Sequence, residues 1–334
     1  MITRRHFGLA GAAAVAACGK APTTEAPGEL TFSILPTGPA ATLEKNWRPV
    51  LDDMSKATGL KVKPFIPSNY TVLIEAMRFK QTDAGWFSNE SGLEAVRRAN
   101  GEVFARTIGP DGLNGYESLL IVNAGSPITI ERIKKCDRTL SFGQADPSST
   151  SGYVAPIAEF FGPNDLQPEK CFSVVRTSNH GANLLAVANG TLDVATGNSR
   201  SLLLNRQAGR AEADKVKVIW QSDPLPEDPI IWRKDLDPAV KEKLRQFFLT
   251  YARGDSAEAA AQRAKLRPLS IGGFEPADNS HLLMVRDVEA KEQWFLAKWG
   301  GDKDKMAAAK KAMDELDVQV QAVEGRTGAP AAAQ

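Results

Sequence analysis

The stretch Asp146-Pro147-Ser148-Ser149-Thr150-Ser151-Gly152-Tyr153 lies between an expected strand and an expected helix, and this order decides the fold class. Apolar residues predict the strand at 139–143 and the helix at 153–161. The first-turn N–H groups of a helix have no intrahelical partner, and the helix dipole adds partial positive charge there. Three consecutive hydroxyls beside these donors predict a binding site for a tetrahedral oxyanion. The alternative is an N-cap with extra hydroxyls, since Ser and Thr are common caps.

The same strand-then-helix order is expected on both sides of this turn. Before it, strands are predicted at residues 30–35, 61–66 and 83–87, and helices at 41–58, 70–80 and 93–100. Around and after it, strands are predicted at 119–122, 140–142, 172–175, 194–196 and 216–220, with helices from about residues 129, 151, 181 and 199. Such alternation is typical of parallel sheets that helices cover on both faces.

A proline-rich segment separates this alternating part from the end of the chain. Residues 223–229 contain three prolines, which end the pattern and predict a crossing between two lobes. The apolar run 230–232 is expected to return to the first sheet. Helices are then expected at 238–252, 256–266, 285–299 and 303–324.

The length of the chain suits two lobes, because about 300 residues follow residue 28 and one core rarely grows that large. The expected fold class is α/β, with two parallel-sheet lobes, a ligand cleft between them and a helical C-terminal segment. Lobe 1 is expected to hold residues 29–116 and 226–325, lobe 2 residues 117–225, and residues 326–334 a disordered tail. Ligands bind at the carboxyl ends of parallel strands, and two lobes can close on a ligand by a hinge.

The first 28 residues predict an export signal and a tether. Twin arginines are followed by the apolar run 8–17, which is too short to span a bilayer, so residues 1–17 are expected to be a signal peptide. Val15-Ala16-Ala17-Cys18 resembles a lipobox, in which Cys18 is lipidated, and the twin arginine resembles a Tat signal. The alternative is an ordinary signal peptide with an incidental cysteine. Residues 18–28 are expected to form a flexible tether.

Composition argues against several classes of partner and cofactor. The formal net charge is +1 and no basic run with interleaved aromatics occurs, so nucleic acid is not an expected partner. No second apolar segment is long enough to cross a membrane. Neither a cofactor nor a metal site is expected, because only His180 and His281 follow the signal and neither has a His or Cys at ligand spacing.

Two cysteines remain after Cys18, and each precedes an expected strand. Cys136 comes before the strand around residue 140, and Cys171 before the strand 172–175. An exported protein enters a compartment that permits disulfides, so a Cys136–Cys171 bridge is expected. Two free buried thiols are the alternative.

Several separate motifs occur in an order that resembles a known family. The matching stretches are Ile74–Phe79, Glu94–Gly101, Asp146–Gly152, Leu185–Asn189, Asp193–Thr196 and Asp228–Lys234. From about residue 30 to about residue 285 the chain resembles the substrate-binding proteins of phosphonate ABC transporters, the PhnD-type group. The resemblance implies a periplasmic type II binding fold, in which one lobe holds both termini and the other is inserted. It also implies a phosphonate or phosphate-ester ligand and the transmembrane subunits of an ABC permease as partners.

The resemblance assigns binding roles to individual residues. The phosphonyl group is expected to be held by the Ser149–Ser151 hydroxyls and by backbone N–H groups of the helix. His180 from the second lobe joins them, Tyr70 from the first lobe closes over the ligand, and Asp228 at the second crossing reads the rest of it. Taken without the family, His180 is a hydrogen-bonded structural histidine, Tyr70 a helix-start aromatic and Asp228 a turn residue.

Two positions depart from the family pattern. Phe87 stands where aminoalkyl-phosphonate binders have a second tyrosine, which predicts the loss of one hydroxyl from the site. Arg200 stands where they have the glutamate that holds the ligand ammonium. A cation repels a cationic ligand group by about 1–4 kcal/mol at partly screened distances, so 2-aminoethylphosphonate is not the expected ligand. The alternative is that Arg200 turns to solvent or pairs with Glu227 or Asp228.

Two classes of function remain open at this point. The expected one is a non-enzymatic binding component of an ABC importer, with a binder of inorganic phosphate or phosphite as its closest alternative. The other class is a periplasmic phosphatase or hydrolase in which His180 is the base. No Gly-x-Ser-x-Gly elbow and no two-metal cluster of Asp and His occurs in the sequence, which argues against the enzyme.

Overall fold

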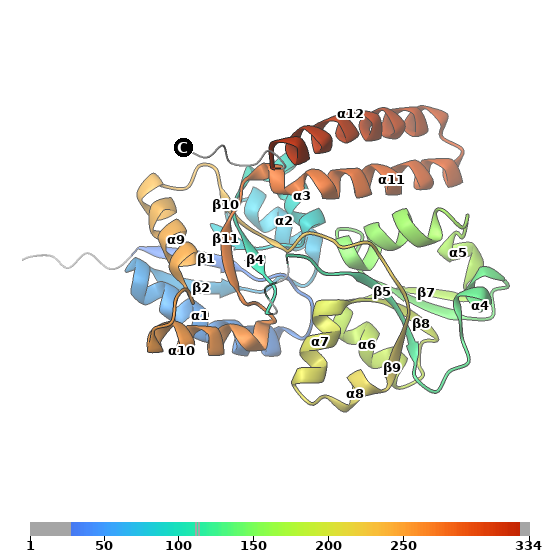
Figure 1. The fold of residues 1–334 in the computed structure, drawn as a ribbon, viewed down its shortest axis with the longest axis horizontal. Helices are drawn as coiled ribbons and strands as arrows, with labels where there is room; N and C mark the ends of the chain where they lie inside the picture. The colour runs from blue at the N-terminus through green and yellow to red at the C-terminus, as the bar shows by residue number, and fades with distance from the viewer. Residues whose placement is uncertain (1–27, 111, 113, 328–334) are drawn as a thin grey trace, which may run out of the picture.

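The computed structural model describes residues 28–327 apart from 111 and 113, and apart from the side chains of 317 and 320–327. Two sheets form two lobes, and a pair of long C-terminal helices lies along one side of both (Figure 1). The expected signal peptide, Cys18, the tether up to residue 27 and the tail beyond residue 327 lie outside the described residues. Among the described helices, none combines the length and apolarity needed to cross a membrane.

The first sheet has six strands in the order β11-β4-β10-β3-β1-β2. The strands are β1 (Glu29–Ser33), β2 (Lys61–Phe65), β3 (Ala84–Trp86), β4 (Gly101–Ile108), β10 (Pro229–Arg233) and β11 (Gly273–Pro276). β1 pairs in parallel with β2 and β3, whereas β10 runs antiparallel to β3 and β4, and β11 antiparallel to β4. The sheet is therefore mixed, which corrects the expectation of a parallel sheet. The return of residues 230–232 to this sheet is confirmed.

The second sheet has five strands in the order β7-β6-β8-β5-β9. They are β5 (Ser118–Asn123), β6 (Ser141–Gln144), β7 (Val174–Thr177), β8 (Val194–Asn198) and β9 (Val216–Gln221). β6 is parallel to β7 and β8, but β5 is antiparallel to β8 and β9. The chain enters this lobe through β5, which lies between β8 and β9 and runs opposite to both. β9 follows β8 through α7 (Ser199–Gln207) and α8 (Ala211–Asp214) and runs in the same direction as β8.

Helices cover both sheets, and their ends follow local signals. Helix α1 (Ala40–Thr58) buries Trp47, Val50 and Met54 on one face. Its C-cap is Gly59, whose φ of 68° lies in the left-handed region that glycine adopts without steric cost. The other α-helices are α2 (Tyr70–Arg78), α3 (Asn89–Arg98), α4 (Ile130–Lys134), α5 (Pro168–Cys171), α6 (His180–Ala188), α7 (Ser199–Gln207), α8 (Ala211–Asp214), α9 (Pro238–Thr250), α10 (Ala257–Leu266), α11 (Leu283–Gly300) and α12 (Lys303–Thr327). Short helical turns of other types are η1 (Thr150–Val154), η2 (Ile157–Phe161), η3 (Arg267–Leu269) and η4 (Asn279–Leu282).

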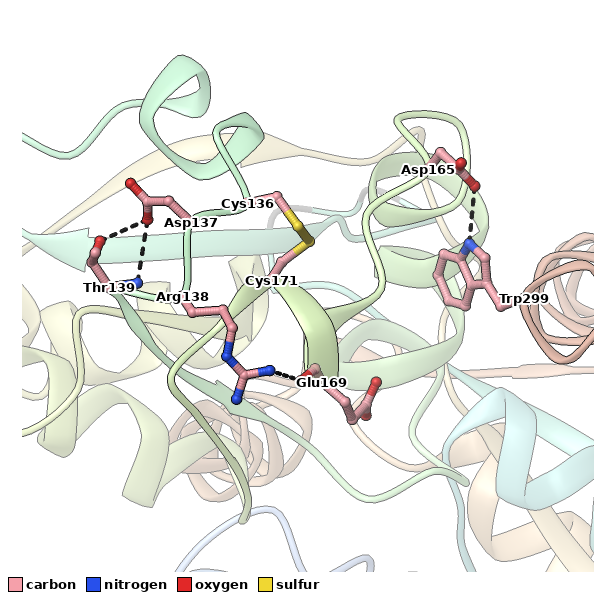
Figure 2. Close-up of a disulfide and its surroundings, with 8 residues drawn as sticks. All are labelled: Cys136, Asp137, Arg138, Thr139, Asp165, Glu169, Cys171 and Trp299. Atoms are coloured by element: carbon pink, nitrogen blue, oxygen red, sulfur yellow. Dashed lines mark hydrogen bonds between the residues drawn. A yellow bond between two sulfur atoms is a disulfide. The ribbon is translucent and has the colours of Figure 1, made fainter.

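A disulfide joins Cys136 and Cys171, as expected (Figure 2). The two cysteines precede β6 and β7, which are parallel neighbours, so their starting edges lie side by side. Near this bridge, Asp165 accepts a hydrogen bond from Trp299 Nε1 at 3.1 Å. Trp299 belongs to α11, so the C-terminal helices reach the second lobe.

Helix α11 contacts both lobes. It packs against α3 of the first lobe and against η1 and η2 of the second. Arg97 of α3 pairs with Glu289 of α11, and the Phe295 ring lies so close to Gly162 that a Cβ there would come within 2.2 Å of it. The α11–α12 pair thus connects the lobes in addition to the two chain crossings.

Candidate functional site

A cavity of about 280 Å³ lies between the two lobes. Five helices begin at this cavity, and each contributes its N-cap or its first residue to the wall. They are α2, α3, η1, α6 and α7. Helix N-termini favour anions because their first N–H groups and their dipoles point outward. The arrangement therefore favours a negatively charged ligand.

Ser149 and Ser151 line this cavity at the start of η1. The Ser149 hydroxyl accepts a hydrogen bond from Gly152 N at 3.1 Å, and the Ser151 hydroxyl accepts one from Asn198 Nδ2 at 3.3 Å. The Ser149 hydroxyl also interacts with the Tyr70 phenol, and the Ser151 hydroxyl with the Tyr116 phenol. A Cβ on Gly152 would lie 2.1 Å from Cβ of Ala145, so glycine lets the turn close tightly against the end of β6.

Thr150 behaves differently from its two neighbours. It is fully buried, does not line the cavity, and its Oγ1 accepts a hydrogen bond from Glu90 N of α3 at 2.8 Å. Its hydroxyl connects the two lobes rather than facing the ligand space. Of the three hydroxyl residues expected around an anion, Ser149 and Ser151 line the cavity and Thr150 does not.

His180 lines the cavity at the N-terminus of α6 and is only 3% exposed. Burial lowers the pKa of its imidazole to about 4, and Nδ1 has no hydrogen-bond partner among the described residues. At this pKa the ring is neutral near pH 7 and carries one N–H that a ligand could accept from. An anion beside it would raise this pKa, because a neighbouring negative charge favours the imidazolium.

Two tyrosines face the cavity, Tyr70 from α2 and Tyr116 from the segment before β5. Burial raises the pKa of both phenols, and the charge of Asp228 adds to the rise, so both remain neutral hydrogen-bond donors. Phe87 is fully buried in an apolar cluster with Leu35 and does not line the cavity. Phe87 therefore lies outside the cavity lining, whereas Tyr116 brings a second phenol to it.

Three charged residues line the cavity together: Asp228, Glu227 and Arg200. Burial, and then the charge of Glu227, raise the pKa of Asp228, while hydrogen bonds from Tyr116 and Trp86 oppose the rise. Arg200 Nε donates to Glu227 Oε1 at 2.9 Å, and Arg200 Nη2 donates to Gly115 O at 2.8 Å. Arg200 lines the cavity, yet its charge is balanced by Glu227. Of the alternatives left open, the pair with Glu227 is the one present.

Sequence reasoning missed Tyr116 and assigned Glu227 no role in the ligand space. Both lie on the two crossings between lobes, which pair with each other at Tyr116 and Leu225. Tyr116 OH donates to Asp228 Oδ1 at 3.4 Å, across 112 residues of sequence. Their position in the sequence could have indicated them, because polar residues on the segments that cross between the lobes lie beside the interlobe cavity.

Hydrogen bonds between the lobes surround this site. Tyr70 N donates to Asp146 Oδ2 at 3.3 Å, Gly181 N to Thr37 O at 3.2 Å, and Ser88 Oγ to Ser148 O at 3.0 Å. These bonds hold the two lobes together over the cavity, so the structure represents a closed form.

A cluster of carboxylates lies outside this cavity. Glu90, Glu94 and Glu289 bring oxygens within 4.8 Å of one another. Arg97 pairs with Glu94 and Glu289, so a guanidinium already balances part of this charge. The cluster belongs to the packing of α3 against α11.

Comparisons with known proteins show the family of this chain. The family described as "ABC transporter, phosphonate, periplasmic substrate-binding protein" matches residues 32–282. The phosphonates-binding periplasmic protein of Escherichia coli (strain K12) is 36% identical over 292 residues, covering 86% of this chain and 85% of that one.

Solved structures show the same architecture. A binding protein component of an ABC phosphonate transporter from Pseudomonas aeruginosa has a TM-score of 0.83 at 36% identity, covering 89% of this chain and 99% of that one. A protein from Prochlorococcus marinus (MIT 9301), solved in complex with methylphosphonate, shares the fold with a TM-score of 0.68 at 20% identity, covering 79% and 98%. The chain described here belongs to the family of periplasmic substrate-binding proteins of phosphonate ABC transporters.

Proposed function

We propose that this protein captures a phosphonate or a phosphate ester between its lobes and delivers it to the transmembrane subunits of an ABC importer. The observation that carries the proposal is the convergence of Ser149, Ser151, His180, Tyr70 and Tyr116 on one interlobe cavity. All five side chains can donate a hydrogen bond to a phosphonyl oxygen. Hydrogen bonds to a charged acceptor are stronger than those between neutral groups, so this set suits an anion.

The size of the cavity favours an organic ligand over inorganic phosphate or phosphite. Its volume of about 280 Å³ is near the lower end of pockets that hold drug-sized ligands, which begin at roughly 300 Å³. A bare tetrahedral oxyanion needs only the donor cluster. The remaining wall includes Leu43, Leu204 and Leu269, which have nothing to offer a free oxyanion.

A binding role also fits the site better than hydrolysis. Ser149 Oγ is the N-cap of η1, and His180 Nδ1 has no third group to orient the ring as a general base. We infer that bound ligand leaves unchanged. Phosphorus NMR of a phosphoester incubated with the protein would show no new resonance, whereas appearance of inorganic phosphate at enzyme-dependent rates would contradict this.

The direct test is a thermal-shift screen of phosphonates and phosphate esters. A ligand present at 100 times its dissociation constant should stabilise the native state by about 2.7 kcal/mol. Methylphosphonate, 2-aminoethylphosphonate, glycerol 3-phosphate and inorganic phosphate form a suitable first panel, with sulfate as a control anion. If no phosphorus compound raises Tm at millimolar concentration, the proposed function is wrong.

We predict that 2-aminoethylphosphonate does not bind more tightly than analogues with a neutral or anionic tail. Arg200 adds a cation where an ammonium holder is expected, and Glu227 is already paired with it. The Arg200→Glu variant should shift the ratio of affinities toward 2-aminoethylphosphonate by at least about tenfold, or 1.4 kcal/mol. Calorimetry on both proteins measures the ratio, and Arg206→Glu, an exposed change on the same helix, is the control.

The location follows from the same proposal. Cys18 is expected to be lipidated and to hold the protein at the membrane through the tether. A Cys18→Ala variant should move from the membrane fraction to the soluble periplasmic fraction. Equal partition of the two proteins would favour the ordinary signal peptide.

A further inference from the structure

The cavity extends beyond Ser149 and Ser151 as a groove lined by residues of α1 from the first lobe and of α7 from the second. On α7 the lining residues are Ser201, Leu204, Asn205 and Ala208. Their spacing of three, four and seven residues is that of one helix face. Seven residues of helix rise about 10 Å, so the groove continues for roughly this length past the N-terminus of α7.

The opposite wall of the groove is one face of α1. Thr42, Leu43, Asn46 and Trp47 line it, again at helical spacing. Trp47 is held in place by rings on either side, with centroids 5.5 Å from Phe32 and 5.7 Å from Trp86. These contacts fix the indole, so this part of the α1 wall belongs to the packed core.

The amide groups in the groove are already held by the protein. Asn46 Nδ2 donates to Pro268 O at 3.1 Å, and Asn205 Nδ2 donates to Ser201 O at 2.7 Å. Two further lining residues keep a polar atom without a hydrogen-bond partner among the described residues, Trp47 at Nε1 and Ser270 at Oγ. Beside them the groove offers the apolar side chains of Leu43, Leu204 and Leu269. This wall suits carbon atoms of a ligand better than charged groups.

Beyond the donor end, one charged side chain lines the described part of the groove, and it lies at the far end. Among the described lining residues, Arg200, Glu227 and Asp228 lie at the donor end, and Arg210 is the remaining charged side chain. Arg210 precedes α8 and is exposed, and it has no ion pair among the described residues. A guanidinium at this place can bind a carboxylate or a second phosphoryl group in bidentate fashion.

We propose that this groove is a subsite for an elongated organic group, so that the ligand is a phosphonate or phosphate ester with an apolar chain of several carbons and a second anionic group at its far end. The assignment rests on the proposed function, since the phosphonyl group must occupy the Ser149–Ser151 end. The Arg210 guanidinium binds the second anionic group of the ligand. The leucines of the groove bind the chain between the two anionic groups.

A chain-length series tests the subsite. Affinities of methyl-, butyl- and hexylphosphonate, and of the ω-carboxylates 3-phosphonopropionate and 6-phosphonohexanoate, are measured by calorimetry at one pH and ionic strength. We expect hexylphosphonate to bind at least about tenfold more tightly than methylphosphonate, because each buried methylene contributes favourably. We expect 6-phosphonohexanoate to exceed hexylphosphonate by a further factor of about five, because the guanidinium meets its carboxylate.

Two variants separate the parts of the proposal. Arg210→Gln should remove the advantage of 6-phosphonohexanoate over hexylphosphonate while methylphosphonate binds as before, and Arg206→Gln is the matched control on the same surface. Leu204→Trp should fill the groove and abolish the gain with chain length. Tight methylphosphonate binding with no gain from longer chains would overturn the subsite alone. Absence of binding by every phosphonate would overturn the proposed function itself.

Discussion

Alanine at both Ser149 and Ser151 is expected to lower the affinity for a phosphonate by about 3–4 kcal/mol, or roughly 100- to 1,000-fold. Both hydroxyls line the cavity and are at most 3% exposed, so water cannot replace them easily. Each would donate to a charged oxygen, and such bonds contribute more than neutral ones. Calorimetry with methylphosphonate measures the loss.

The control for this variant is Ser148→Ala, because Ser148 belongs to the same turn but does not line the cavity. Its affinity should stay within about twofold of the unchanged protein, as for most changes outside a contact. Ser149 also caps η1, so the double variant should lose about 1 kcal/mol of stability, which denaturant unfolding measures separately. Unchanged affinity in a folded double variant would place the anion elsewhere.

The second large effect concerns Glu292, a carboxyl on α11 that is 3% exposed. Burial, and then the charge of Glu289, raise its pKa to about 8, although Gln293 Nε2 donates to its Oε2 at 2.8 Å. Glu90 across the α3 contact is in a similar position, since burial and the charges of Glu289 and Glu292 raise its pKa. Two buried acids thus share one region beneath the C-terminal helices.

The sign of the pH effect follows from these shifts. Between the ordinary pKa of 4.5 and about 8, Glu292 holds a proton in the folded state but is ionised in the unfolded state. The folded state therefore loses stability as the pH rises through this window. Glutamine cannot ionise, so Glu292→Gln should stabilise the fold by roughly 3 kcal/mol at pH 8 and by almost nothing below pH 4.5.

Thermal unfolding of both proteins between pH 4 and pH 9 checks this prediction. The difference in Tm should grow with pH and level off above about pH 8. Glu242→Gln, an exposed change on α9, should leave Tm nearly constant at every pH. A Glu292→Gln variant that is less stable than the unchanged protein at pH 8 would show that the carboxylate is ionised and usefully paired in the fold.

Local patterns in the sequence were sufficient for the elements around the site. The helix at residues 41–58 and the turn 146–152 follow from periodicity and hydroxyl chemistry, which act between near neighbours. The disulfide also followed, because Cys136 and Cys171 each precede a strand and the two strands are parallel neighbours. The family assignment rests on such local motifs in order, and its match to residues 32–282 confirms it.

Strand direction needed the tertiary structure. Strand β4 was missed, and β5, β9 and β10 pair antiparallel, because pairing partners far apart in sequence leave no local signal. A strand buried on both faces shows the same apolar run whichever way its neighbour points.

The same limit applies to the direction of single side chains in the site. From the sequence alone, the length of the chain and its family resemblance predicted two lobes. The hydroxyl-rich turn at a helix N-terminus followed from residues that are neighbours in the chain. Only the tertiary structure decided that Thr150 Oγ1 accepts a hydrogen bond from Glu90 N, that Tyr116 and not Phe87 lines the cavity, and that Arg200 pairs with Glu227. Each of these depends on which groups meet when two lobes close, and that is set by packing over distances of 27 to 60 residues and more.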